Sequence, residues 1–466
     1  MNVVFWVSAV VLLFVIPRFA WFKMFQKAGK KGWIAFIPFW DVWTVVEIVG
    51  KPKYYFFLCY VPVINFIVTI GLLVDALKCF GRGKWYDLVL AVLFPFIYLP
   101  YIAFKLDVDY LGKLDDLPKE KKSTKDEWLE AISFAVIAAT LIRWAFMEAY
   151  VIPTPSMENS LLVGDYLFVS KMNYGPRTPQ TPLQVPLTHA KMWGFLDFIP
   201  SYTSAVQLPM YRFPGLSEVE RNDVVVFNYP LEFEHPTDLK THYIKRCVAI
   251  PMDTLEIKDT QVFVNGQQSE NPVQMQFEYA IVTNKSISER TFKKYDIWDF
   301  SREKWGYRAH ALPDEVMKMK ELTFVEDVVM LKDQWKTRFP DPVSLPWSVD
   351  NYGPLVIPAK GLTIDLDQEM VAKYGSTIRD YENLDNVEVR DDQLYKDGEL
   401  MTQHTFRQNY YFMMGDNRHN SQDSRYWGFV PEDHVVGEAS FIWLSIDPNE
   451  SFFSKIRWSR LFNGIK

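Results

Sequence analysis

Cysteine and histidine are scarce in this chain, and their scarcity excludes two common ways of stabilising a domain. The 466 residues include 3 cysteines and 7 histidines. Cys59 and Cys79 fall in or beside apolar runs near the N-terminus, which leaves Cys247 as the one thiol of the polar remainder. A single thiol closes no internal disulfide, so an exported domain here must hold together by packing. The histidines are scattered without metal-ligand spacing, and we therefore expect neither a structural nor a catalytic metal.

Positive charge is also in short supply. The chain has 50 Lys and Arg against 57 Asp and Glu, which gives a formal net charge of −7 at pH 7. Nucleic-acid binding relies on lysine and arginine to meet the phosphates, so we expect no nucleic-acid partner. The length exceeds that of one ordinary core and predicts about two to four structural units.

Apolar runs and aromatic residues, by contrast, are abundant, and the longest apolar runs lie within the first 152 residues. Four runs are each long enough to cross a hydrocarbon core of about 30 Å as a helix, at residues 3–22, 54–77, 88–104 and 132–152. They could instead be buried helices of a soluble core, but so many runs exceed what a soluble domain usually carries. The sequence therefore predicts a multi-pass α-helical membrane anchor.

Lysine clusters orient this anchor. One cluster at residues 23–31 follows the first run, and another at residues 119–125 precedes the last run. The positive-inside rule places both in the cytoplasm, so the last run leads outward and the chain after it is exported. We thus predict a membrane domain at residues 1–105, a cytoplasmic linker at 106–127 and an anchor helix at 128–152. Arg143 and Glu148 lie in the later half of the anchor, where they could pair or reach the headgroups.

Downstream of the anchor, short segments rich in β-branched and aromatic residues alternate with turn signals. Strands are expected at residues 165–171, 223–229, 242–250, 255–264 and 438–446, the fourth of these folding as a hairpin around Asp259. This pattern predicts a mainly-β exported domain built of antiparallel sheets or a partly open barrel.

A stretch of mixed composition interrupts this β pattern. Residues 268–399 carry charged patches and a helix-like segment at 314–322, and we interpret them as a second, non-catalytic α+β lobe inserted into the first domain. The catalytic domain then comprises residues 153–267 and 400–450, followed by a basic and aromatic tail at 451–466. The tail is either an ordinary packed terminus or a segment that rests on the membrane surface.

Three short segments carry the residues of greatest chemical interest. Residues 153–171 read PTPSMENSLLVGDYLFVSK, residues 243–246 read YIKR, and residues 415–431 read GDNRHNSQDSRYWGFVP. In this order they resemble the type I signal peptidases, membrane endopeptidases that cut leader peptides with a serine and a lysine. The resemblance covers roughly residues 128–267 and 400–450. A strand segment at residues 221–227 fills a further motif of that family.

The chemistry of such a pair depends on the charge of the lysine. A serine hydroxyl is a weak nucleophile and needs a base within hydrogen-bond reach, for which His242 or His419 could also be proposed. At its ordinary pKa, a lysine is neutral at pH 7 in roughly one molecule in 2,500. Burial lowers a lysine pKa by up to about 3–5 units. Lys245 lies in a run that indicates a half-buried strand, which suits this role.

The resemblance implies a role for each residue of these segments, and no cofactor. Ser156 is the expected nucleophile and Lys245 the expected base. The Thr154 hydroxyl and the Ser156 backbone N–H would form the oxyanion hole. Ser421 would orient the lysine amine, supported by an ion pair between Asp423 and Arg425.

The resemblance also implies small substrate pockets. The positions that match pocket-lining residues of the family are Tyr150, Ile152, Pro153, Met157, Leu161, Tyr243 and Ile244. Such pockets accept Ala-x-Ala before the cut, and misfit groups cost roughly 1–3 kcal/mol each. The expected partners are secretory preproteins and the lipid bilayer, at the inner membrane of a bacterial cell with the catalytic domain outside.

The chain departs from the family pattern at three positions. Ala249 and Met252 stand where glycine is usual, and Met252 bears on the geometry of the turn that follows. His419 stands where aspartate is usual, and we assign it no role.

Two other classes of protein remain as alternatives. Self-cleaving transcriptional repressors use a serine and a lysine on a related β core, but they are soluble and bind DNA, which the apolar runs and the acidic charge disfavour. A catalytically inactive membrane scaffold is the other alternative, and the intact Ser156 and Lys245 positions argue against it.

Overall fold

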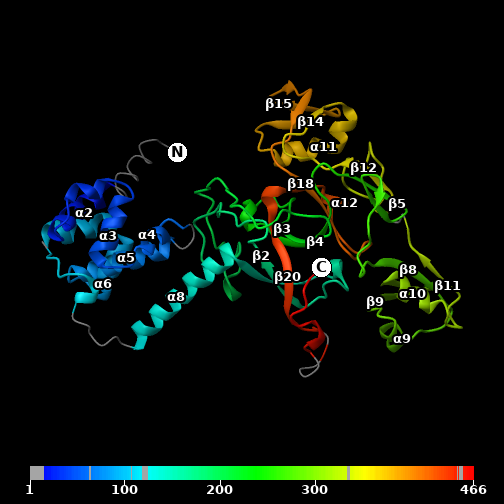
Figure 1. Cartoon of the computed structure of the whole chain (residues 1–466), viewed down its shortest axis with the longest axis horizontal. Helices are drawn as coiled ribbons and strands as arrows, with labels where there is room; N and C mark the ends of the chain where they lie inside the picture. Colours follow the sequence, from blue (N-terminus) through cyan, green and yellow to red (C-terminus); the bar gives the residue numbers. More distant parts are fainter. Residues whose placement is uncertain are drawn as a thin grey trace. The chain divides into compact units, whose positions relative to one another are not determined.

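The computed structural model of the protein describes residues 15–61, 65–106, 108–117, 124–332, 336–448, 450 and 455–465. The chain forms two compact units, residues 1–141 with 182–206 and residues 142–181 with 207–466 (Figure 1). The start of the first apolar run, residues 3–14, lies outside the described residues.

The first unit is helical. Its elements are α2 (Ile16–Lys27), η2 (Gly32–Phe36), α3 (Trp40–Val49), α4 (Tyr54–Leu58), α5 (Asn65–Cys79), α6 (Trp85–Leu93), α7 (Pro95–Pro100), η3 (Tyr101–Lys105), η4 (Leu114–Asp116) and, within residues 182–206, η6 (Gly194–Leu196). One apolar core joins the elements of residues 16–116 and includes Met24, Phe25, Leu77 and Ile102. Pro95 begins α7, where the missing N–H of proline costs no helical hydrogen bond.

The helices of this unit are shorter than the apolar runs. The run at residues 54–77 contains α4 and most of α5, and the run at residues 88–104 contains α7 with parts of α6 and η3. Within the described parts of the chain, no helix is by itself both long and apolar enough to cross a bilayer. Tyr86–Val92 and Pro95–Lys105 meet the condition only as a pair, and they bend by 113°. The multi-pass anchor therefore stays a prediction.

The predicted anchor helix at residues 128–152 ends earlier than expected. Helix α8 (Thr124–Ala145) stops before Phe146, and Met147–Val151 form strand β1 instead. Strand β1 pairs in antiparallel register with β2 (Asp165–Ser170). Glu148 is buried there and binds both Arg143 and, at 2.7 Å, the amine of Lys171. A helix running on through residue 152 would lose these ladder hydrogen bonds and this buried pair.

The second unit is built on a seven-stranded sheet in the order β1-β2-β20-β3-β4-β18-β19. The remaining strands are β3 (Val224–Asn228), β4 (His242–Ala249), β18 (Tyr410–Met414), β19 (Val430–Pro431) and β20 (Val435–Ser445). All neighbouring pairs are antiparallel, which confirms the prediction of a mainly antiparallel β body. Successive residues of β3 enter two different cores because strand side chains alternate.

A second sheet, in the order β12-β5-β6-β7, lies beside the first. Its strands are β5 (Thr254–Lys258), β6 (Gln261–Val264), β7 (Gln267–Gln268) and β12 (Tyr352–Val356). The turn between β5 and β6 has positive φ at Asp259 and Thr260. The sequence places the hairpin correctly because Asp tolerates this conformation.

The predicted single lobe at residues 268–399 is two separate insertions, which Figure 1 shows as two groups of elements. The first, named here the β8–β11 lobe, has its own core. It contains β8 (Phe277–Val282), α9 (Glu289–Lys294), β9 (Asp299–Glu303), β10 (Gly306–Ala311), α10 (Pro313–Met319) and β11 (Asp327–Met330). Helix α10 corresponds to the helix expected at residues 314–322.

The second insertion packs on the catalytic domain and has no separate core. It contains β13 (Thr363–Asp365), α11 (Gln368–Tyr381), β14 (Val387–Arg390), β15 (Gln393–Lys396), β16 (Glu399–Leu400) and β17 (Gln403–Thr405). Tyr374 and Ile378 of α11 share a core with Val248 of β4 and Phe412 of β18. Composition alone could not divide the stretch, because both halves are equally mixed.

Short turns and helices complete the second unit. They are η5 (Pro155–Met157), η7 (Thr237–Leu239), α12 (Ser424–Trp427), η8 (Glu432–His434) and η9 (Trp458–Arg460). The described part of the tail returns to the sheet through single bridges at Ile446–Ile456 and Phe441–Gly464.

Candidate active site

Ser156 lies on a short turn that follows the edge strand β1. Thr154 is extended, with φ −134° and ψ 153°, and Pro155 then begins the 3-10 turn η5. The fixed φ of proline favours this start. Ser156 is only 9% exposed. Its carbonyl oxygen accepts a hydrogen bond from the N–H of Asn417 at 3.2 Å, and the Asn417 side-chain amide donates to Pro155 O at 3.2 Å.

Lys245 projects from the interior of the main sheet toward this turn. Its residue is 4% exposed, and its Nζ lies 2.7 Å from Ser156 Oγ and 2.8 Å from Ile244 O. Burial lowers the pKa of the Lys245 amine to about 8, against the opposing fields of Asp423 and Asp416. The structure therefore brings together the two residues expected as nucleophile and base, which are 89 positions apart in the chain.

Two buried ion pairs hold the loop that covers them, residues 415–421, named here the catalytic loop. Asp416 accepts two hydrogen bonds from Arg246, at 2.8 Å from Nε and 2.7 Å from Nη2. It also accepts one from Ser160 Oγ at 2.6 Å. Asp416 thus ties the catalytic loop to β4 and to the turn that follows Ser156.

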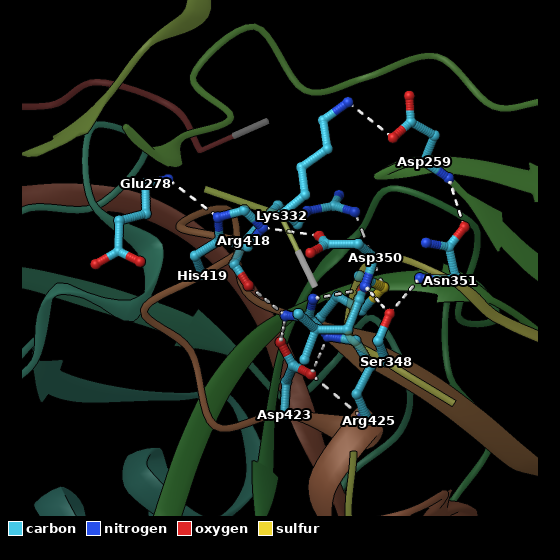
Figure 2. A network of polar contacts seen from close by, with 12 residues as sticks. Asp259, Glu278, Lys332, Ser348, Asp350, Asn351, Arg418, His419, Asp423 and Arg425 are labelled. Atoms are coloured by element: carbon cyan, nitrogen blue, oxygen red, sulfur yellow. Dashed lines mark hydrogen bonds and ion pairs between the residues drawn. The ribbon is translucent and has the colours of Figure 1, made fainter. Parts of the chain in front are cut away.

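The second pair joins Asp423 to Arg425, as expected from the resemblance. Its two contacts measure 2.9 Å and 2.7 Å (Figure 2). The Asp423 carboxylate also accepts the N–H of Gly415 at 3.1 Å. Burial opposes ionisation of Asp423, but the charge and hydrogen bonds of Arg425 outweigh it and keep the pKa of the carboxyl below its usual value. Both groups are therefore charged at neutral pH.

Ser421 does not form the hydrogen bond predicted for it. Its Oγ is buried and has no hydrogen-bond partner among the described residues, and the Lys245 amine contacts Ile244 O instead. Ser421 still lies close to the nucleophile's turn. A Cβ atom added to Gly415 would stand 2.3 Å from Ser421 Oγ and 2.5 Å from Ser156 O.

Comparison with known proteins identifies the family. The sequence model of "Signal peptidase, peptidase S26" matches residues 125–305 and 357–444. The chain belongs to this family. It is a serine endopeptidase. A second model, of a family of unknown function, matches residues 33–113.

Curated relatives agree with this assignment. Signal peptidase I of Buchnera aphidicola subsp. Acyrthosiphon pisum is 26% identical over 339 residues, which cover 71% of this chain and 80% of that protein. Signal peptidase I of Rickettsia canadensis is 25% identical over 347 residues, which cover 74% of this chain and 86% of that protein.

The residues expected to line the peptidase's pockets fall mainly in one cluster. Ile152, Met157 and Leu161 are buried together, and Tyr150 and Ile244 pack against them. Tyr243 belongs to a different cluster, where it stacks on Tyr229 at 4.5 Å between ring centroids. Pro153 and Thr154 are exposed beside Ser156, and the Thr154 side chain caps no N–H of η5.

The structure shows the surroundings of two of the three residues that depart from the family pattern, Met252 and His419. Met252 adopts φ +72°, a conformation that favours glycine, and its side chain is 58% exposed. The His419 side chain is buried and contacts residues of two other segments. Among the described residues, no group of three or more His, Cys, Asp and Glu could hold a metal ion.

Several residues of the site escaped sequence reasoning. Arg246, Asp416 and Asn417 lie in the sequence motifs, but the sequence predicts no role for any of them. The ion pair between Arg246 and Asp416 could not be predicted from the sequence around Lys245, because the two residues are 170 positions apart. The segment at residues 221–227 forms the turn before β3 and most of β3 itself. In this turn Arg221 forms an ion pair with Asp253 at 2.6 Å.

Proposed function

We propose that this protein is a membrane-bound signal peptidase I that removes N-terminal signal peptides from exported preproteins after small residues. The observation that carries the proposal is the 2.7 Å contact between Lys245 Nζ and the buried Ser156 Oγ. With a pKa of about 8, roughly one Lys245 amine in ten is neutral at pH 7, a gain of more than two orders of magnitude over an unperturbed lysine.

In the proposed acylation step, the neutral Lys245 amine accepts the Ser156 hydroxyl proton as Oγ attacks the scissile carbonyl carbon. The charge that develops on the carbonyl oxygen would be stabilised by the Ser156 N–H and the Thr154 hydroxyl. The Lys245 ammonium then donates its proton to the leaving amine nitrogen, and the signal peptide stays bound to Oγ as an ester.

In the proposed deacylation step, Lys245 accepts a proton from a water molecule, whose oxygen attacks the ester carbonyl carbon. The Lys245 ammonium then returns the proton to Ser156 Oγ as the ester bond breaks, and the signal peptide leaves with a free carboxyl group. The buried Ser421 hydroxyl, which has no partner among the described residues, would supply a hydrogen bond to this water. The Arg246–Asp416 and Asp423–Arg425 pairs support the site by holding the catalytic loop.

Substrate selection would combine small pockets with membrane topology. The cluster of Ile152, Met157, Leu161, Tyr150 and Ile244 would line a pocket next to Ser156 that suits small side chains. The apolar runs and lysine clusters of the N-terminal part support a multi-pass anchor in the bacterial cell membrane with the catalytic domain on the exported side. We also propose that the exposed aromatic residues of the tail contact the lipid bilayer.

The dyad assignment is tested by substitution at both positions. Ser156→Ala and Lys245→Ala should each lower preprotein processing by at least about 10³-fold while membrane insertion is unchanged. Ser301→Ala on β9 and Lys258→Ala on β5, both exposed positions, serve as matched controls. Near-normal processing by either dyad variant would refute the assignment.

A further inference from the structure

The imidazole of His419 is hydrogen-bonded on both sides. Its side chain is fully buried, Nδ1 accepts the backbone N–H of Glu278 at 3.1 Å, and Nε2 lies 2.8 Å from Asp350 Oδ1 (Figure 2). A backbone N–H can only donate, so Nδ1 carries no proton in this arrangement. The hydrogen is therefore on Nε2 and is donated to Asp350.

The two partners of His419 belong to the two connections of the β8–β11 lobe. Glu278 lies in β8, where the chain enters the lobe, and Asp350 precedes β12, where the chain returns to the catalytic domain. Neighbouring backbone contacts reinforce the arrangement, since Gln276 N donates to Asp416 O and Arg418 N donates to Gln276 O, each at 2.9 Å. One side chain of the catalytic loop thus joins the entrance and the exit of the lobe.

Asp350 is itself held firmly. Its carbonyl oxygen accepts the N–H of Thr260 at 2.9 Å, and Arg425 Nη1 donates to the neighbouring Val349 O at 3.3 Å. Asn351 accepts the N–H of Asp259 at 3.1 Å, and the Asp259 carboxylate pairs with Lys332 at 2.7 Å (Figure 2). The backbone that carries Asp350 is therefore held in place, and the catalytic loop contacts it through His419.

The catalytic loop in turn fixes the nucleophile. Asn417, two residues before His419, donates to both Ser156 O and Pro155 O. The loop packs so closely on Ser156 that a Cβ at Gly415 has no room. A shift of the loop at His419 therefore moves the backbone that carries Ser156 or releases it.

We propose that His419, held by Asp350 and by the backbone of Glu278, is a positioning residue for the Ser156–Lys245 dyad, and that the β8–β11 lobe sets the depth of the catalytic loop through it. The inference rests on the proposed function and deepens it. The lobe acts as a structural support for the catalytic loop, although none of its residues is expected to touch the reacting atoms. Asp350 supplies from a distant segment the carboxylate that the catalytic loop lacks at position 419.

The test compares His419→Asn and Asp350→Asn in the full-length protein, with kcat/KM measured on a preprotein between pH 6 and 10. The Asn side chain retains an acceptor for the Glu278 N–H but cannot reach Asp350. Each variant should lower kcat/KM by about 10-fold, because small misplacements of catalytic groups have large effects on rate. The double variant should be no worse than either single one, as expected of residues that act as a unit.

The pH profile separates positioning from general stability. A loosened catalytic loop admits water to Lys245, so the acid limb of kcat/KM should move to higher pH in both variants. The matched control is His404→Asn, since His404 Nε2 also contacts a buried carboxylate, Glu382, at 3.1 Å. It should lose stability without a change in kcat/KM or in the pH profile. Titration of Ser156 with a serine-directed acylating inhibitor corrects every rate for the folded fraction.

Rescue provides an independent readout. His419→Asp places a second negative charge near Asp350 and should cause the largest loss of kcat/KM. Adding Asp350→Asn should recover about 10-fold, because it removes the repulsion between the two charges. The proposal is overturned if His419→Asn and Asp350→Asn keep kcat/KM within about twofold and an unshifted profile, or if they behave as His404→Asn does. Failure of the proposed function would be seen separately, as Ser156→Ala retaining activity.

Discussion

A buried lysine destabilises the folded protein at any pH at which the same lysine is charged in the unfolded chain, because burial removes the water that stabilises the charge. Lys245 is charged in the unfolded chain below its ordinary pKa, but its pKa in the folded protein is about 8. Between these two values the unfolded state binds more protons than the folded state, so stability rises with pH in that window. Below pH 8 the whole penalty is present, and the contact with Ser156 is maintained against it.

Lys245→Met should therefore give an inactive but more stable protein. Methionine has a similar length and no charge, so the free energy of unfolding at pH 7 should rise by about 1–3 kcal/mol. The gain should shrink as pH rises above 8 and disappear near the ordinary lysine pKa. Thermal unfolding of both proteins in detergent across this range measures it. A gain independent of pH would contradict the burial argument.

Met252 destabilises the fold in a different way, through the conformation of its backbone. Its φ of +72° belongs to a region that costs a side-chain-bearing residue about 1–2 kcal/mol, whereas glycine adopts it freely. Met252→Gly should stabilise the protein by up to about 1 kcal/mol, because the greater flexibility of glycine in the unfolded chain offsets part of the relief.

The control for this prediction is a methionine of similar exposure in a helix. Met317 in α10 is also exposed, and Met317→Gly should destabilise the protein by about 1 kcal/mol, since glycine is unfavourable in a helix. Thermal or denaturant unfolding of both variants checks the difference in sign. Equal destabilisation by the two substitutions would contradict strain at Met252.

For single residues, the sequence predicts which side chains are functional better than it predicts which residues they contact. Ser156, Lys245, Asp423 and Arg425 could be singled out because each lies in a short motif. The partners of His419 could not, since Glu278 and Asp350 are 141 and 69 positions away in the chain. The expected contact of Ser421 with Lys245 was wrong for a related reason, because rotamers within a buried cluster depend on all its members.

Among the elements, the close approach of the catalytic loop to η5 is the most sensitive contact. Gly415 does not need its glycine for backbone conformation, as its φ is not positive, but for space. Gly415→Ala must push the loop away from Ser156 O, Ser421 or both. We expect kcat/KM to fall by about 100-fold with the fold retained, as for a displacement of about 1 Å at an active site.

Gly464→Ala is the matched control, because nothing lies within 4 Å of a Cβ at that position and its φ is ordinary. Circular dichroism and preprotein processing measured on both variants separate misplacement from unfolding. Full activity of Gly415→Ala would show that the loop can move without consequence for the dyad.

Element type could be predicted wherever the pattern is local. The strands expected at residues 165–171, 223–229 and 242–250 correspond to β2, β3 and β4, because alternation and β-branched residues suffice to indicate them. The boundary between α8 and β1 could not be predicted, because the apolar run continues across it. Pairing with β2 and the buried contacts of Glu148 decide that boundary, and both involve residues distant in the chain.

For the molecule as a whole, the described tail bears on the two expectations raised by its composition. Arg460 pairs at 2.6 Å with Asp165, which is fully buried, so the tail is a packed terminus. Trp458 and Phe462 nevertheless expose 69% and 75% of their surfaces. Packing by way of an arginine while aromatic side chains point outward is the arrangement expected of a segment that rests on a lipid surface.

Residues 142–466, which we propose to be exported, should therefore bind liposomes through these two side chains. Replacing both residues, by Trp458→Ser and Phe462→Ser, should weaken partitioning onto anionic vesicles by at least about tenfold. The reason is that full burial of one large apolar side chain contributes roughly 1.5–3 kcal/mol to the free energy of binding. Val343→Ser removes an apolar side chain that is 87% exposed in another loop and should change nothing. Co-sedimentation with vesicles measures all three proteins. Because Arg460 and its contact with Asp165 remain in the double variant, equal binding by the double variant and the unsubstituted protein would show that the aromatic residues do not contact the membrane.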